Sequence, residues 1–401
     1  MKYIREVENI KAGIFSSCGI VAEEQRVEMS EKNQQDYFKI PDKCYNWSGV
    51  RVSSNALTKF VSLYILYPLM LILYFMIIYN IRFKKNISDI TEVFISISTF
   101  TIITFRKTLL IRNGSIYEDI LKKQSHYWKY YMFGKPTEMK LRKSMEFCVM
   151  VIKFLIASTT GSIIFHSIIS PIIEGKIVLP QPCWVPNNDP VANDIIFALE
   201  NIFYMEGTNY LVVFDGLYLL MTANLKTQMI LLRKAVASIN FREDEKTTWA
   251  KLKEYCEYHK FLLRIHGKIN KIYSAFFLMT YVFTIMGTCT PLFVIFYEEA
   301  DMVLLGKSVF IALILNTLLV MTFIPAGELE IEAEKLSFEI YSINWYETKN
   351  LKIRKFVLFW IMQTQIPVQM SGGGMLIVNR PLVLQVQRIA YSLTSFLAGL
   401  S

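Results

Sequence analysis

The chain has 401 residues, of which 53% are hydrophobic and only 19% are charged, a composition too apolar for an ordinary soluble protein of this length. The net charge of +9 would suit a nucleic-acid-binding protein, but the basic residues lie between apolar segments, as membrane topology requires. The six cysteines are scattered without a Cys-x-x-Cys pair, which argues against a disulfide framework and a zinc site. We therefore expect a membrane protein that binds neither nucleic acid nor metal.

Apolar segments of about 20 residues, the length that crosses a bilayer, predict an all-α bundle of transmembrane helices. In chain order the seven predicted spans are Ala56–Ile81, Asp89–Ile111, Met145–Ile173, Asp194–Thr222, Ile272–Tyr297, Met302–Ile324 and Met375–Leu400. The second span is the weakest, because Ser, Thr, Arg106 and Lys107 dilute it. So polar a span is expected to face protein rather than lipid. The alternative of six spans, without this helix, would place a strongly basic loop outside the cell.

The basic residues also predict the orientation of the bundle. Loops 112–144, 223–271 and 325–374 hold 24 Lys and Arg residues, whereas the other three loops hold 4. Because basic residues collect on the cytoplasmic side, we expect these loops and the segment 1–55 to be cytoplasmic and the C-terminus to be extracellular. A G-protein-coupled receptor has the opposite orientation, and its Asp-Arg-Tyr and Asn-Pro-x-x-Tyr motifs are missing. Paired broken helices and repeats, which would indicate a secondary transporter, are not found either.

Two cytoplasmic segments have helical patterns. Apolar or aromatic residues recur at steps of three and four through 246–273, which predicts that the fourth and fifth helices continue beyond the bilayer. Within 325–374, the sixth helix is expected to run past Pro325, and a second helix to follow from about Asn350 to Gln365. The glycines 372–374 are interpreted as a hinge before the last helix. Helices outside lipid have apolar faces to bury, so 325–374 is predicted to be an assembly region.

The C-terminal region carries a group of motifs. They are Pro325-Ala-Gly-Glu328, Ser337, Ile340-Tyr341, Trp345, Pro367, the glycines 372–374, and Ala390-Tyr391-Ser392 in the last helix. In this respect the chain resembles the insect odorant receptor family. The related gustatory receptors place Gln-Phe after the tyrosine, whereas Ser-Leu-Thr-Ser-Phe-Leu follows Tyr391 here. The Asn379-Arg380-Pro381 sequence departs from the family pattern, and it leaves open whether the last helix starts before or after the proline.

The resemblance implies a subunit of a tetrameric, ligand-gated, non-selective cation channel in the plasma membrane of a sensory neuron. The shared co-receptor of that family has a long insertion between the fourth and fifth helices, and the loop 223–271 is too short for it. The chain thus resembles a tuning subunit, which binds a small volatile odorant and assembles with the co-receptor. A gustatory-type channel remains the alternative, and a G-protein-coupled receptor is less favoured. The sequence has no catalytic constellation and no cofactor fingerprint, so we expect neither an enzyme nor a cofactor.

The resemblance further implies an apolar pocket in the outer half of the bundle, among the second, third, fourth and sixth helices. The candidate pocket residues are Phe94, Ile97 and Ser98, then Ser158, Gly161 and Phe165, then Asn201, Tyr204, Met205 and Thr208, and finally Phe310 and Leu313. Ordinary packing between helices is the alternative for each of them. The last helix would line the pore, where the match carries the family's gate positions onto Phe396 and Leu400. Anchoring in lipid is the alternative for these two residues.

Charges inside the membrane are costly enough to require partners. Lys153 and Asp215 lie at matching depths and predict an ion pair between the third and fourth helices. His166 and Glu200 predict a second pair nearer the outer surface. Glu206 has no partner that the sequence identifies. Four alternating acids are interpreted as the solvated face of a cytoplasmic helix, and they are Glu328, Glu330, Glu332 and Glu334.

Overall fold

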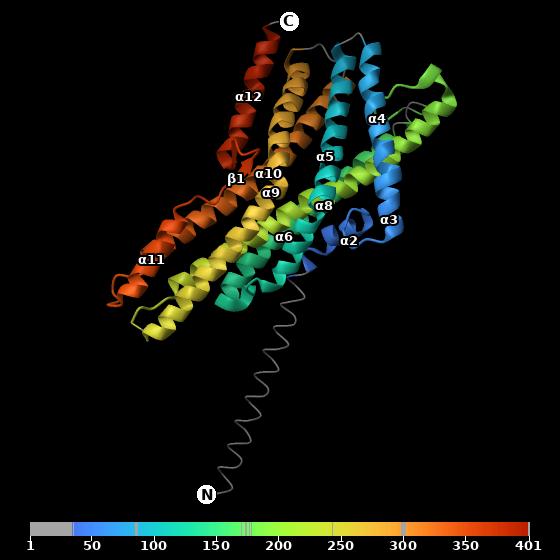
Figure 1. Cartoon of the computed structure of the whole chain (residues 1–401). Helices are drawn as coiled ribbons and strands as arrows, with labels where there is room; N and C mark the ends of the chain where they lie inside the picture. Colours follow the sequence, from blue (N-terminus) through green and yellow to red (C-terminus); the bar gives the residue numbers. More distant parts are fainter. Residues whose placement is uncertain are drawn as a thin grey trace.

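The protein is an elongated helical bundle, drawn in chain order in Figure 1. The computed structural model describes residues 36–84, 87–169, 179–242, 244–297 and 302–399, with a few isolated residues beside these ranges. The first span is one continuous helix, formed by α3 (Ala56–Phe60), the π-helical η1 (Val61–Leu66), α4 (Tyr67–Asn80) and the 3-10 turn η2 (Ile81–Phe83). A short helix, α2 (Lys39–Trp47), precedes it.

The remaining helices follow the predicted spans but several are longer. They are α5 (Ile87–Lys123), α6 (Lys135–Ile164) with its π-helical extension η5 (Phe165–Ile169), α8 (Pro190–Ala237), α9 (Glu245–Tyr297), α10 (Met302–Ser342), α11 (Leu351–Thr364) and α12 (Arg380–Ala398). Three 3-10 turns, η3 (Gln124–His126), η4 (Tyr130–Phe133) and η6 (Pro186–Asn188), lie between them. The predicted fold class is confirmed, as are the helical extensions of the fourth, fifth and sixth spans and the separate helix near 350–365.

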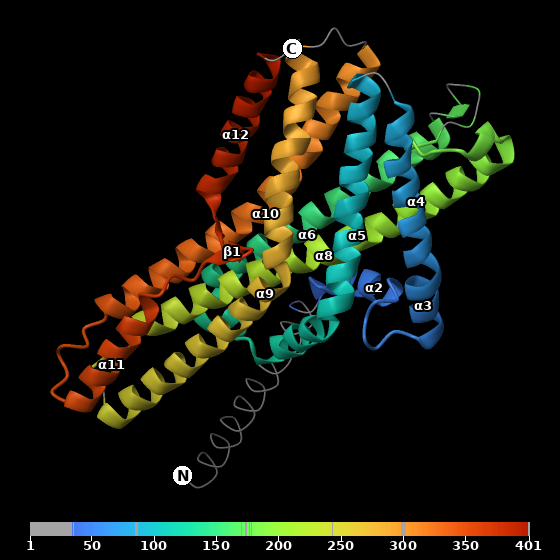
Figure 2. The ribbon, with the colours of Figure 1, turned by 45° about the horizontal axis from the view of Figure 1, so that its top comes forward.

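The elongated molecule has two ends that are built from different sets of helices. At one end, α4, α5, α9, α10 and α12 each have one of their ends. At the other end, α11 lies beside the opposite ends of α9 and α10 (Figures 1 and 2). Among the described residues, the helices of Ala56–Phe83, Lys135–Ile169, Glu245–Phe296 and Ala312–Ser342 are long and apolar enough to cross a membrane. In α5 and α8, charged and polar side chains lower the hydropathy.

The predicted start of the last helix at Met375 is wrong. Strand β1 (Met370–Gly372) pairs antiparallel with β2 (Leu376–Val378). Gly373 and Gly374 have φ angles of 61° and 74°, a left-handed backbone that glycine adopts without steric cost. The triple glycine therefore makes the turn of a hairpin, where a hinge was expected. Helix α12 begins only at Arg380. The side chain of the preceding residue, Asn379, caps this helix by accepting a hydrogen bond from the Leu382 N–H at 3.2 Å.

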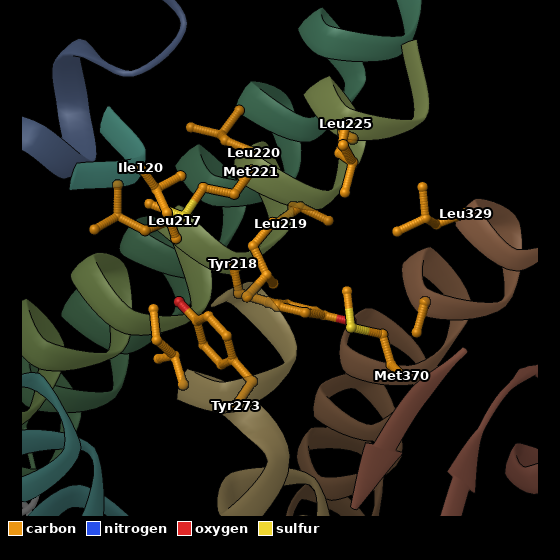
Figure 3. Packing of buried hydrophobic residues seen from close by; sticks show 14 of the residues in the cluster. Ile120, Leu217, Tyr218, Leu219, Leu220, Met221, Leu225, Tyr273, Leu329 and Met370 are labelled. Carbon is orange, nitrogen blue, oxygen red and sulfur yellow. The ribbon is translucent and has the colours of Figure 1, made fainter. Parts of the chain in front are cut away.

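Helix α8 lies at the centre of the core. It packs against α2, α5, α6, α9 and α10, and Figure 3 shows its Tyr218 beside Tyr273 of α9 and Met370 of β1. The Tyr218 hydroxyl donates to the Thr322 carbonyl at 2.7 Å, and the Tyr273 hydroxyl donates to the Phe214 carbonyl at 2.9 Å. Buried tyrosines need such partners, so these bonds fix α9 and α10 against α8.

Large apolar side chains cover the outside of two spanning helices. Phe75 of α4 and Phe147 and Phe154 of α6 are each at least 60% exposed. In water, so many exposed aromatic side chains would drive aggregation. A lipid bilayer removes this cost, which agrees with the predicted membrane location of these helices.

The structure corrects one predicted charge pairing and supplies a partner for Glu206. Asp215 pairs with Arg106 of α5 at 2.9 Å, and Lys153 is exposed on α6. Glu206, for which the sequence offers no partner, pairs with Lys107 at 3.2 Å. The two ion pairs join α5 to α8, which explains why the second span tolerates adjacent basic residues.

The other two expectations about charges have mixed outcomes. Glu200 accepts a hydrogen bond from the Gln181 backbone N–H at 3.1 Å, and the side chain of its expected partner, His166, lies outside the described residues. Among the acids of α10, Glu328 pairs with Lys226 at 2.8 Å and Glu332 with Arg233 at 3.3 Å. At these two positions the acids join α10 to α8, so they are not merely a solvated face.

Candidate ligand groove

Helices α6 and α10 pack on different sides of α8 and form the walls of a groove. Lys234 of α8 donates to the Thr137 hydroxyl of α6 at 2.9 Å, whereas Lys226 of α8 pairs with Glu328 of α10 at 2.8 Å. The strip of α8 with Lys226, Ile230 and Lys234 forms the floor of this groove. Residues at steps of three and four share one helix face, so Met205 and Thr208 lie on the same side of α8 as Lys226 and Ile230. Between them this side is closed, because Thr222 is buried and Asp215 pairs with Arg106 of α5.

The predicted residues on α6 and α10 lie on the same helix faces as the residues of the groove. On α6, Ser158, Gly161 and Phe165 continue the face of Lys140 and Ser144 at steps of three and four. On α10, Phe310 and Leu313 similarly continue the face of Glu328. Lys140, Ser144, Lys226, Ile230 and Glu328 line a cleft of about 550 Å³ at the other end of these faces.

Most of these predicted side chains are open to their surroundings in the single chain. Phe165, Met205 and Leu313 are 50%, 67% and 62% exposed. A Cβ placed on Gly161 would meet nothing within 4 Å. The space beside these side chains therefore has room for a ligand or for lipid. The side chains of Phe94 and Phe310, and Leu400 as a whole, lie outside the described residues.

The polar candidates make local hydrogen bonds. Ser158 donates to the Leu155 carbonyl at 3.0 Å, and the Asn201 amide donates to the Phe197 carbonyl at 2.8 Å. Tyr204 accepts a hydrogen bond from the side-chain amide of Gln181. Thr208 is half-buried. Amide and hydroxyl groups beside apolar surface are the combination that orients a small organic ligand.

The candidates on α5 lie away from this groove. Ile97 packs against the hydrophobic core, and Ser98 is buried. Nearby, Phe100 stacks on Phe203 of α8 with ring centroids 3.8 Å apart. A small apolar cavity of about 10 Å³ lies beside Phe203, between α4 and α8. It has room for about one water molecule, so an odorant does not fit there in this conformation.

The segment 180–184 covers the end of α4 and α8 and was not singled out from the sequence. The Gln181 backbone and side chain bond to Glu200 and Tyr204, as described above. The Asn80 side chain donates to the Pro182 carbonyl at 2.7 Å, and Trp184 lies edge-on to Tyr79 with ring centroids 5.2 Å apart. The signal in the sequence was a tryptophan and three prolines within a short polar loop. Its contacts place this segment next to the candidate pocket residue Tyr204.

Helix α12 has one buried face and one exposed polar face. Leu382, Val386, Ala390 and Thr394 are buried at steps of four where α12 packs on α9 and α10. The exposed side carries a stripe of polar residues, namely Gln385, Arg388, Ser392 and Ser395, flanked by the apolar Leu384, Tyr391 and Phe396. Polar side chains at membrane depth require water or partner protein. The predicted gate residue Phe396 is 64% exposed near the end of the helix.

The sequence model of the 7tm odorant receptor family matches residues 82–391. The chain belongs to this family. The receptor is 26% identical over 208 residues to odorant receptor 82a of Drosophila melanogaster, a match that covers 49% of the chain and 51% of the relative. It therefore spans about half the length of that relative. The resemblance noted in the C-terminal motifs is confirmed.

The fold of the receptor is similar to that of a solved insect olfactory receptor. The structure of OR5 from Machilis hrabei matches with a TM-score of 0.76 and 13% identity over 92% of this chain and 98% of that chain. The structure of OR5 in complex with eugenol matches with a TM-score of 0.75 at the same identity. At this identity the likeness shows the fold alone.

Proposed function

We propose that the receptor is the ligand-binding subunit of an odorant-gated, non-selective cation channel in the plasma membrane. The observation that carries the channel part is the exposed polar face of α12, with Gln385, Arg388 and Ser392. A helix with such a face is unstable against lipid but suits the wall of a water-filled pore between subunits. Family membership and the eugenol complex of a receptor with the same fold support a small organic ligand.

The ligand would bind in the outer part of the groove between α6 and α10. Gly161 and Phe165 would form one wall, and Met205 would form the floor. Asn201 and Tyr204 would supply the polar contacts. Such a pocket suits a small volatile molecule with one or two oxygen atoms.

The partner would be the co-receptor subunit, and the contacts would be made by α11 and the adjoining ends of α9 and α10. Phe338, Phe359 and Met362 are 71%, 57% and 66% exposed in this part of the chain. It lies beyond the predicted spans, where water is the alternative environment, so burial of these side chains favours association. The short connection between α8 and α9 supports a tuning subunit.

The test is to express the receptor with and without a co-receptor and to record currents with an odorant panel. We expect odorant-evoked currents that reverse near zero potential and that require both subunits. Epitope tags at both ends, stained on intact cells, should label only the C-terminal tag if the orientation is right. Surface expression of both subunits without any evoked current, or labelling of the N-terminal tag alone, would contradict the proposal.

A further inference from the structure

The cleft at the far end of the groove is strongly basic. It has a volume of about 550 Å³ and lies between α6, α8, α10 and the start of α12. Six basic side chains line it, and they are Lys140, Lys226, Arg233, Lys234, Lys335 and Arg380. Only two acidic residues do so, Glu328 and Glu332. We call this feature the basic cleft.

The two carboxylates are already shared between four of the cations. Glu328 pairs with Lys226 at 2.8 Å and with Arg380 at 3.0 Å. Glu332 pairs with Arg233 at 3.3 Å and with Lys335 at 2.8 Å. The basic cleft therefore keeps an excess of positive charge after its internal ion pairs have formed.

Two of the lysines have no acidic partner among the described residues. Lys234 donates to the neutral Thr137 hydroxyl at 2.9 Å, and Lys140 is exposed on α6. The Nε atom of Arg233 is buried and has no hydrogen-bond acceptor in the described part of the chain. These donors, from two helices, are available to an anion with several oxygen atoms.

An apolar surface adjoins the basic cleft. On α6, the face of Lys140 and Ser144 continues at steps of three and four to Phe147 and Phe154, which are 60% and 63% exposed. The predicted third span begins at Met145, so the basic cleft lies at the membrane boundary and the aromatic side chains lie within the bilayer. A ligand that fits both parts has a multiply charged anionic head and apolar tails.

We propose that the basic cleft binds the phosphorylated headgroup of an anionic membrane phospholipid, whose acyl chains lie along the Phe147–Phe154 face of α6. Basic pockets between helices on the cytoplasmic side recognise such headgroups, and this side is the cytoplasmic one by the basic-residue rule. A soluble polyphosphate shares the headgroup chemistry but does not use the apolar face.

The bound headgroup would also act on α12. Its phosphates would compete with Glu328 for Arg380, the first residue of α12, and for Lys226. This consequence rests on the proposed function, because α12 is the proposed pore helix. Lipid binding itself does not depend on that assignment, so the two are tested separately.

The binding test uses purified full-length receptor, with a fluorescent short-chain phosphatidylinositol bisphosphate as the probe. We expect the double variant Lys140→Gln/Lys234→Gln to bind it about 30-fold more weakly, since each lysine contributes about fivefold. Neither substitution leaves a carboxylate without its partner. The matched control, Lys253→Gln/Lys352→Gln, removes the same charge from exposed positions on α9 and α11 and should bind as the wild type does. Size-exclusion profiles and melting temperatures confirm that each variant is folded.

Competition distinguishes the lipid from a soluble anion. Free inositol trisphosphate should displace the probe only at a much higher concentration than the short-chain lipid, and phosphatidylcholine should not displace it. Equal potency of the free headgroup would overturn the lipid assignment, and unchanged binding by the Lys140/Lys234 variant would overturn the site. Normal lipid binding without any odorant current would instead count against the proposed channel function alone.

Discussion

Gly327 of α10 lies directly against the backbone of Arg380, where α12 begins. A Cβ placed on Gly327 would come within 2.8 Å of the Arg380 nitrogen, so a side chain here forces the two helices apart. The neighbouring Glu328 binds the Arg380 guanidinium at 3.0 Å. A close backbone contact and an ion pair therefore join a wall of the ligand groove to the proposed pore helix at one point. We therefore expect movement of α10 at this position to displace the start of α12.

Gly327→Val should displace the start of α12. Overpacking of this kind typically costs about 1–3 kcal/mol, and we expect a lower melting temperature together with altered odorant-evoked current. Gly267→Ala in α9 is the matched control, because a Cβ there would meet nothing within 4 Å. Thermal unfolding of the purified proteins and currents at matched surface expression measure the two effects. If Gly327→Val behaves like Gly267→Ala in both assays, the close contact has no role.

Lys107→Met should strongly destabilise the bundle. The Lys107 side chain is fully buried and pairs with Glu206 at 3.2 Å, so its removal leaves a carboxylate without a counter-charge, at a cost of about 3–5 kcal/mol. The double variant Lys107→Met/Glu206→Gln should recover most of this loss, because no charge remains and Gln can still accept from Tyr210. Arg142→Met, which breaks the more exposed pair with Glu138, should cost no more than about 1 kcal/mol. Equal melting temperatures for the two single variants would refute the importance of the buried pair.

The stability of the receptor should fall between about pH 6.5 and about pH 4. Burial lowers the pKa of His259 to about 4, and burial likewise lowers the pKa of His266 to about 4. The neutral His259 ring accepts a hydrogen bond from Trp360 at 3.2 Å. Between the folded and unfolded pKa values the unfolded chain binds more protons, so the free energy of unfolding rises with pH there. On acidification the free energy of unfolding therefore falls, by at most about 1.4 kcal/mol per pH unit for each histidine.

Melting temperatures measured between about pH 7.5 and about pH 5.5 test this dependence. His259→Gln should reduce the slope, because one of the two buried titrating groups is removed. His126→Gln replaces an exposed histidine and should leave the slope as it is. A wild-type slope in His259→Gln would show that this ring does not contribute.

Gly161→Leu should abolish the odorant response without impairing folding. A Cβ at this position meets no atom within 4 Å, so the leucine extends into the outer groove and takes up the space of a ligand. Thr160→Leu adds a similar side chain on another exposed face of α6 and should respond normally. Dose–response curves at matched surface expression compare them. A normal curve for Gly161→Leu would move the pocket elsewhere.

Phe396→Ser should raise the ligand-free leak current. An apolar ring closes a pore because water is unstable in a narrow apolar constriction. A serine hydroxyl binds water and so favours a hydrated, conducting constriction. Leu400→Ser is expected to act similarly, although co-receptor subunits that supply the rest of the ring would make either effect partial. Phe75→Ser changes an equally exposed side chain on α4 and should leave the leak unchanged. Wild-type leak and ion selectivity in both α12 variants would reject the gate assignment.

The features that could be predicted from the sequence are those that depend only on position along a single helix. Apolar length and helical periodicity identified the spans and their cytoplasmic extensions, because these signals are local. The pairing of Asp215 could not be predicted in this way. Lys153 has the matching depth, but depth is only one coordinate, and the rotation of α6 leaves Lys153 exposed while Arg106 of α5 meets Asp215 at 2.9 Å.

In the candidate site, too, local features could be predicted from the sequence and contacts between distant parts of the chain could not. The small and aromatic residues Ser158, Gly161 and Phe165 share a face, as their spacing required, and their role in binding stays a prediction. The segment 180–184 and the basic cleft depend on contacts between distant parts of the chain. The hairpin before α12 was missed for the same reason, since Gly373 donates to the Ser274 carbonyl of α9 at 3.0 Å.

The hairpin also makes the connection between β2 and α12 sensitive to inserted or deleted residues. Its strand β1 is held by Asn270 of α9, whose side-chain oxygen accepts from the Ser371 N–H at 2.8 Å, and only Asn379 separates β2 from α12. One inserted residue would turn α12 by about 100° about its axis and carry Leu382 and Val386 away from their packing partners. Related chains can therefore vary in residue type here, but an insertion or deletion between the hairpin and the last helix would turn the packed face of that helix away from α9 and α10.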